Sequence, residues 1–147
     1  MSHVADIDLE INDLGALKEA GKCLGLELVK QSTYRWFGQH VGDYPLPKGF
    51  TTADLGKCDY VLRIPNNDEA YEIGLVKRKD GKGYQPLWDF WAGGKGLEAK
   101  VGKDAERLIH EYTIALSTKE LRREGFRVSR SVHPVTKKPV LVARRGV

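Results

Sequence analysis

Residues 71–90 read YEIGLVKRKDGKGYQPLWDF, and their pattern is the strongest indication of the fold class. Its two halves are rich in β-branched, aromatic and leucine residues, and Asp80-Gly81 between them is a strong signal for a β-hairpin turn. An earlier strand is predicted at residues 58–64, and the turn-forming Pro65–Asp68 separates it from the strand at 71–78. These segments, with a third strand at 84–90, predict a meander of three antiparallel strands.

The N-terminal region predicts a strand, a helix and two further strands. Residues 5–11 alternate apolar and acidic side chains, which is typical of a half-buried strand. Asn12-Asp13 then offers a helix cap, apolar residues recur at helical spacing as far as Leu24, and Gly25 is a favourable stop. Two strands are expected to follow, at residues 26–31 and 33–38.

The remaining segments alternate between irregular and regular structure. The two prolines in residues 40–57 favour an irregular loop, because proline cannot donate to a strand ladder. Residues 92–103 hold four glycines and predict a second loop. Apolar residues then recur with a helical period from 103 to 124, and two short strands near 126–132 and 139–144 form a C-terminal hairpin.

These elements predict one α+β domain over residues 1–147. We expect a mainly antiparallel sheet with two helices packed on one face, the irregular loop 40–57, and a basic C-terminal hairpin at 126–145. The apolar stretches are too short to cross a bilayer and the N-terminus lacks the pattern of a secretory signal. Two cysteines, Cys23 and Cys58, suit a reducing compartment, so we expect a cytoplasmic protein without membrane contact.

The positive charge is concentrated at the C-terminal end. The chain carries a net charge of +4, and residues 119–147 contain nine basic and two acidic residues. The other 118 residues therefore carry a net −3. This asymmetry indicates an acidic partner, either nucleic acid or an acidic protein surface, although a solvated basic face without a partner would have the same composition.

Several short motifs resemble an uncharacterised family of conserved hypothetical chloroplast reading frames. The motifs are Tyr71–Leu75, Asp80–Tyr84 and Trp88–Trp91, together with Met1–His3, His110–Tyr112 and Glu124–Val128. This domain of unknown function also occurs in cyanobacteria, other bacteria and phages. Its genes often neighbour those of AAA-type ATPases, so the resemblance implies an accessory role beside such an ATPase. The loop at 40–57 departs from the compact members of the family.

No motif in the sequence predicts a metal, a cofactor or a catalytic nucleophile. The four histidines are scattered, and the two cysteines are 35 positions apart. The glycine-rich Ala92–Leu97 lacks the pattern of a phosphate-binding loop. If the protein is an enzyme, the best candidates are Asp89 or His110 as general base and Arg35 as anion clamp.

Our leading interpretation is a non-enzymatic adaptor that docks a protein partner. Three tryptophans are more than a small core requires, and tryptophan is favoured at protein interfaces. The expected docking surface is a rim beside loop 40–57, made of Arg35, Trp36, His40, Tyr44 and Trp91. The competing interpretation is that Trp36 and Trp88 simply complete the core.

The alternative interpretation is a nucleic-acid-binding protein that uses the C-terminal hairpin. Its candidate contacts are Arg127, Lys137, Lys138, Arg144 and Arg145. Aromatic side chains are not interleaved with these cations, so the sequence favours weak electrostatic binding over readout of the bases. A free strand edge in the same segment would also permit a homodimer.

Overall fold

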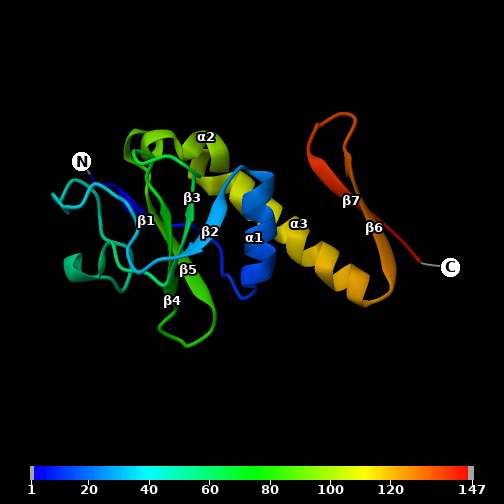
Figure 1. Cartoon of the computed structure of the whole chain (residues 1–147), viewed down its shortest axis with the longest axis horizontal. Helices are drawn as coiled ribbons and strands as arrows, with labels where there is room; N and C mark the ends of the chain where they lie inside the picture. The colour runs from blue at the N-terminus through cyan, green and yellow to red at the C-terminus, as the bar shows by residue number, and fades with distance from the viewer. Residues whose placement is uncertain (1, 146–147) are drawn as a thin grey trace.

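The computed structural model describes residues 2–145, so Met1 of the N-terminal motif and residues 146–147 lie outside this description. Its main element is a five-stranded antiparallel sheet in the order β1-β5-β4-β3-β2 (Figure 1). The strands are β1 (Val4–Asp6), β2 (Glu27–Lys30), β3 (Tyr60–Arg63), β4 (Ile73–Lys77) and β5 (Tyr84–Asp89). The last three form the predicted meander, and the α+β class is confirmed.

The helices α1 (Leu14–Cys23), α2 (Glu98–Val101) and α3 (Glu106–Arg123) pack on one face of this sheet. Leu17 of α1 and Leu108 of α3 are fully buried in one cluster with Leu62 and Leu75 of the sheet. The α1 boundaries agree with the sequence prediction, because Asp13 Oδ1 accepts the Ala16 N–H at 2.9 Å and Gly25 takes a positive φ just beyond the helix.

The opposite face of the sheet is covered by the long connection between β2 and β3. Tyr34 and Leu55 from this connection are buried against Val61 and Leu87. The Tyr34 ring lies directly on the backbone of Gly74, where a Cβ atom would be 2.2 Å from Cδ1 of the ring. The central strands are therefore buried on both faces, between a helical layer and an irregular layer.

The predicted strand at 33–38 is wrong. Within residues 2–145 this segment forms only an isolated bridge, between Thr33 and Lys57. Side-chain carboxylates take the place of a strand partner: the Arg35 N–H donates to Glu72 Oε1 at 2.8 Å, and the Phe37 N–H donates to Asp89 Oδ2 at 3.1 Å. These bonds hold the backbone of residues 33–38 over one face of the sheet, so the segment does not pair along the sheet edge as a strand would.

Two other predictions need correction. The first strand covers residues 4–6 instead of 5–11, because the Leu9 N–H turns back to the Ile7 carbonyl and leaves the ladder. Residues 92–103 are not a plain loop: they contain α2 and, before it, a left-handed turn at Ala92–Lys95 with φ values from 52° to 65°. Glycine at two of these four positions permits this conformation.

The helix α3 runs without a break for 18 residues and joins the sheet body to the C-terminal hairpin. At its buried end, the Tyr112 hydroxyl accepts the N–H groups of Asn12 at 3.1 Å and Asp13 at 3.2 Å. One turn before its exposed end, Lys119 Nζ donates to Asp13 Oδ2 at 2.6 Å, and this bond lowers the pKa of Asp13. The start of α1 is thus fixed by α3.

The contact between Tyr34 and Gly74 yields a stability prediction. We expect Gly74→Ala to lower the free energy of unfolding by about 2–3 kcal/mol, because the added methyl group overlaps a buried ring. In a Tyr34→Ala background the same substitution should cost less than about 1 kcal/mol. Urea unfolding of the four proteins in this cycle measures the difference, and an equal cost in both backgrounds would contradict the assignment.

Candidate nucleic-acid interface

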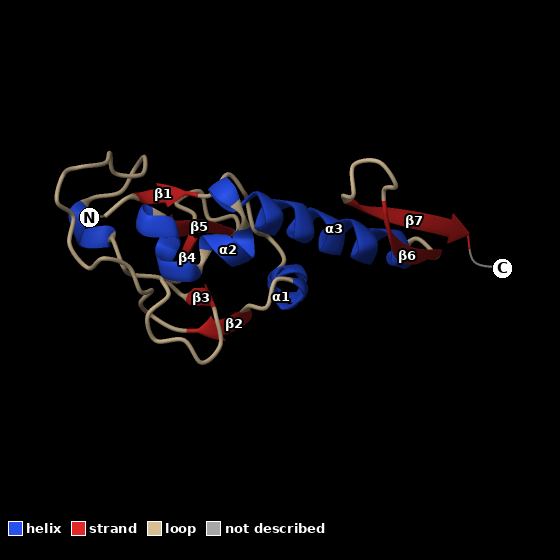
Figure 2. Cartoon of the chain, turned by 90° about the horizontal axis from the view of Figure 1, so that it is seen from above, coloured by secondary structure: helices blue, strands red, loops and turns tan. Residues whose placement is uncertain are grey.

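The strands β6 (Phe126–Val132) and β7 (Pro139–Arg145) form a separate two-stranded sheet. This predicted hairpin lies against α3, at the far end of the molecule from the large sheet (Figures 1 and 2). A two-stranded ribbon is at best marginally stable alone in water. Its geometry therefore depends on how it is attached to α3.

The attachment centres on an ion pair between Arg130 of β6 and Glu111 of α3. Arg130 Nη1 donates to Glu111 Oε2 at 2.8 Å, and Nη2 donates to Oε1. Glu111 is only 8% exposed, so this pairing satisfies a carboxylate that would otherwise be buried alone. Hydrogen bonding to Glu111 also raises the pKa of Arg130 above its ordinary value.

A groove of about 570 Å³ separates the hairpin from α1 and is floored by α3. Its apolar walls include Ala20 of α1, Ile114 of α3, and Val128 and Leu141 of the hairpin. Arg130 reaches across it, with Nη1 at 3.8 Å from Cys23 Sγ. The hairpin is therefore held at a distance from α1 by a few side chains, and its other face is left uncovered.

The strand register separates an inner from an outer face. On the inner face, Arg130 lies opposite Leu141, and Val128 lies opposite Ala143. On the outer face, Arg127 is directly opposite Arg144, and both are exposed. Ser129 and Ser131 of the same face lie opposite Val142 and Val140.

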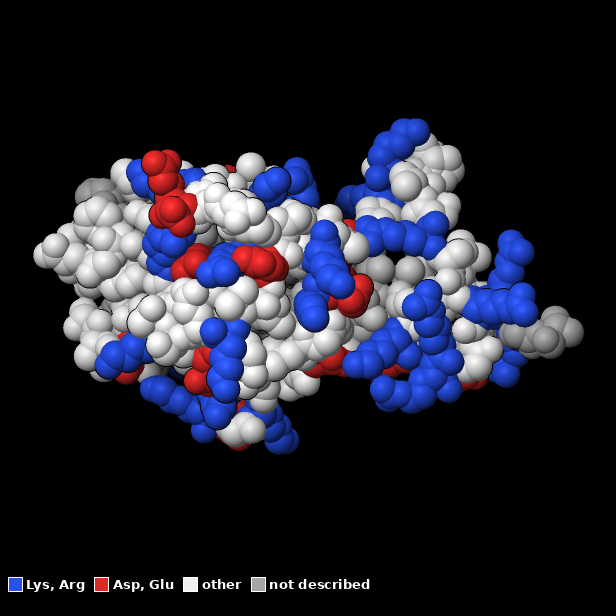
Figure 3. All heavy atoms as spheres, viewed as in Figure 1, with Lys and Arg blue, Asp and Glu red and all other residues white. Residues whose placement is uncertain are grey.

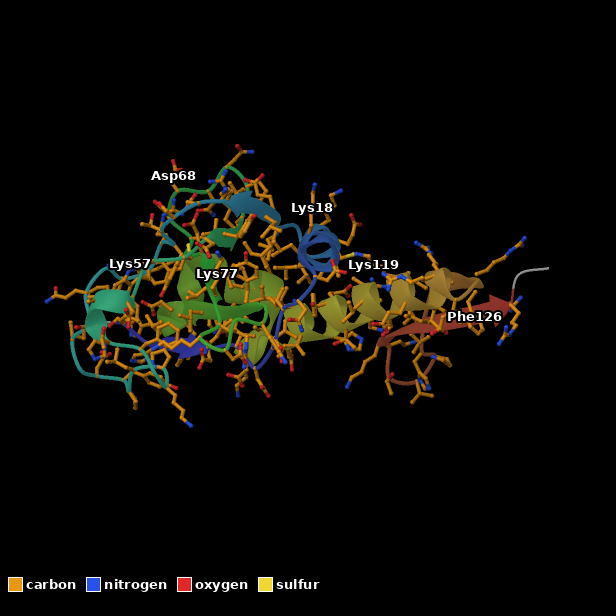
Figure 4. All side chains as sticks on the ribbon, turned by 90° about the horizontal axis from the view of Figure 1, so that it is seen from below. Lys18, Lys57, Asp68, Lys77, Lys119 and Phe126 are labelled. Atoms are coloured by element: carbon orange, nitrogen blue, oxygen red, sulfur yellow. The ribbon has the colours of Figure 1, made fainter. Side chains whose placement is uncertain are left out.

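The hairpin is cationic throughout. Residues 126–145 contain six basic residues and no acidic residue. Within residues 2–145, the Arg130–Glu111 bond is the hairpin's only ion pair, and the Arg145 guanidinium lies 5.0 Å from the Phe126 ring. Lys and Arg side chains gather over the hairpin and the end of α3 (Figure 3), and Figure 4 shows side chains projecting from both sides of the ribbon near Phe126.

The residues predicted to form a protein-docking rim are all half-buried. Arg35 donates to the Ala70 carbonyl at 2.8 Å, and Trp36 packs in the irregular layer. The Tyr44 ring lies 5.1 Å from the rings of both His3 and Phe90. Lys95 Nζ lies over the Trp91 ring, 4.8 Å from the ring centroid. His40 is half-buried in the loop between Trp36 and Tyr44.

Asp89, one candidate general base, is a structural acceptor. It is fully buried, and its carboxylate accepts the N–H groups of His3 at 3.0 Å, Phe37 at 3.1 Å and Trp91 at 3.1 Å. The backbone segments of the predicted rim are joined by these bonds. The other candidate, His110, is exposed on α3, and Arg35, proposed as the anion clamp, is engaged with backbone carbonyls.

Burial raises the pKa of the Cys58 thiol to about 12, which disfavours the nucleophilic thiolate. In residues 2–145, no three histidine, cysteine or acidic side chains come together as a metal site requires. Nor does any helix in that range combine the length and apolar character needed to cross a membrane.

Comparison of the chain with protein-family models, curated proteins and solved structures finds no significant match. The resemblance to the chloroplast reading-frame family therefore stays a prediction.

Sequence reasoning located the cations of the hairpin but missed Glu111, which positions them. A signal was present, because Glu111 falls one turn after Leu108 and immediately before Tyr112, within the apolar stripe of α3. An acidic residue in such a stripe requires a basic partner from another element. Which basic residue pairs with Glu111 depends on how the hairpin packs along α3.

We expect Glu111→Gln to loosen the hairpin and leave the sheet body intact. The pair is partly exposed on the Arg130 side, so its loss should cost about 1 kcal/mol and speed amide exchange of β6 and β7 about fivefold. Glu106→Gln, on an exposed position of the same helix, is the matched control. Hydrogen exchange measures both, and unchanged exchange in the hairpin would refute its anchoring role.

Proposed function

We propose that the protein binds nucleic acid through the hairpin β6–β7. The observation that carries this proposal is a projecting ribbon with six cations, no acid, and one ion pair to the rest of the described chain. Phosphate groups are the ligands that such a surface attracts, because each neutralised phosphate releases bound counterions. Arg122 and Arg123, exposed at the end of α3, extend the same surface.

The opposed pair Arg127 and Arg144 supports an anionic ligand. Like charges directly across an antiparallel ladder destabilise it. Neither guanidinium has an ion-pair partner within the described residues, so the repulsion is offset only by solvent. A phosphate or another anion between them would turn this repulsion into attraction.

Carboxylates on the sheet body favour contact through the hairpin. Asp6, Asp8 and Glu10 line a hollow of about 340 Å³ beside Arg78. Repulsion of these carboxylates by phosphate would favour the hairpin as the contacting surface.

The proposal predicts binding that weakens steeply with salt and depends on the hairpin lysines. Replacing both Lys137 and Lys138 with alanine should reduce the slope of log K against log salt by about 2, since each phosphate contact in duplex DNA contributes about 0.9. Fluorescence anisotropy with a labelled mixed-sequence DNA measures this slope at several salt concentrations.

The matched control replaces Lys57 and Lys77, which are exposed on the sheet body away from the hairpin (Figure 4). This double variant loses the same charge, so its slope should stay close to that of the unaltered protein. Equal effects of the two double variants would mean that net charge, not the hairpin, governs binding. Absence of affinity at low salt would refute the proposal.

A second candidate function is docking of a protein partner, for which the family resemblance implies an AAA-type ATPase. The specific observation in its favour is that Phe37 and Val41 are 42% and 45% exposed. Both belong to the segment that carries Trp36, His40 and Tyr44. An apolar pair exposed beside half-buried aromatic rings suits the centre of a modest protein interface.

Purification from nuclease-treated lysate tests this second function. We expect the double substitution Phe37→Ser and Val41→Ser to reduce recovery of a specific partner about tenfold, as loss of a hot-spot contact would. The exposed hairpin valines, Val132→Ser and Val135→Ser, provide the control and should leave recovery unchanged. If the two double variants recover the partner equally well, the partner docks on another surface and this second function is contradicted.

A further inference from the structure

We infer that the hairpin enters the major groove of duplex DNA with its outer face toward the base edges. This inference rests on the proposed function and names the form of nucleic acid bound. Three features of the hairpin support it: its shape, the side chains of its outer face, and the position of its remaining cations.

The shape of the hairpin matches the groove. Each strand has seven residues, and the two pair along their whole length, which gives a ribbon about 23 Å long. The major groove of B-DNA, about 12 Å wide, admits a two-stranded ribbon of this kind. Because α3 supports only the inner face, the outer face can approach the floor of the groove without a clash from the helix.

The outer face carries side chains suited to base edges. Arg127 and Arg144 stand side by side near the base of the hairpin, and arginine is the commonest partner of guanine O6 and N7. Ser129 and Ser131 add hydroxyl groups that both donate and accept. Val140 and Val142, on the neighbouring strand, offer methyl groups of the kind that contact thymine.

The other cations are placed to contact phosphates. Lys137 and Lys138 lie in the turn that joins the strands. This turn is held by His133, whose Nδ1 accepts the N–H groups of Val135 and Thr136, both at 3.2 Å. A fixed turn presents both lysines at one end of the ribbon, where it would leave the groove and meet the backbone.

The same features disfavour single strands and duplex RNA. The outer face has no aromatic ring on which an unpaired base could stack. The major groove of A-form RNA is deep and too narrow for side chains to read, so the ribbon would meet only its outer phosphates. Preference for duplex DNA is therefore the distinguishing property of this binding mode.

Competition binding tests the inference with a mixed-sequence DNA duplex, an RNA duplex and a DNA single strand of the same length, all at one salt concentration. We expect the DNA duplex to bind about tenfold more tightly than either competitor, the equivalent of one good base-edge contact. Replacing Arg127 and Arg144 with alanine should abolish this preference. Replacing Lys137 and Lys138 with alanine should lower the affinity for all three nucleic acids by a similar factor.

Methylation interference identifies the groove. Methylation of guanine N7 in the major groove should reduce binding, and methylation of adenine N3 in the minor groove should not. Equal affinity for the three ligands, or interference at adenine N3 alone, would overturn the inference while hairpin-dependent, salt-sensitive binding still supported the proposed function. Failure to bind any of the three would overturn both.

Discussion

The dependence of the hairpin on a single helix is the constraint from which the rest of the molecule's organisation follows. Two strands cannot build a core, so β6 and β7 need an external support. That support is α3, whose first half is buried beneath the sheet through Leu108 and Tyr112. Glu111 lies in the same buried half, between Leu108 and Tyr112, and its bond to Arg130 attaches the ribbon to the helix.

The sheet body uses buried carboxylates in a similar way. Glu72 accepts the Arg35 N–H and Asp89 accepts the Phe37 N–H, and Asp89 also accepts the N–H groups of His3 and Trp91. Hydrogen bonds to a charged acceptor are stronger than those between neutral groups. The aromatic residues that first suggested a docking rim are therefore positioned by the same bonds that hold the irregular layer on the sheet.

Local signals predicted most of the fold, and the errors share a physical cause. Asp80-Gly81 and the alternation around it define β4 and β5, and Asp13 with Gly25 bounds α1. The segment 33–38 has the side-chain pattern of a strand, yet the N–H groups of Arg35 and Phe37 donate to carboxylates more than 30 positions away. Residue patterns report local preference, and they cannot specify which distant acceptor a backbone N–H will meet. The hairpin cations were likewise predicted from charge, whereas their pairing register with each other and with Glu111 arises only in the tertiary structure.

The bonds from the Asn12 and Asp13 N–H groups to the Tyr112 hydroxyl span about a hundred positions of the chain. On a translating ribosome, the local Asp13–Ala16 cap of α1 can form early, but the bonds to Tyr112 form only after most of the polypeptide has emerged. Contacts of such long sequence separation slow folding, because the intervening chain has to be ordered first. We expect the central meander, with its short-range pairings, to assemble early and the cationic ribbon to join the molecule late.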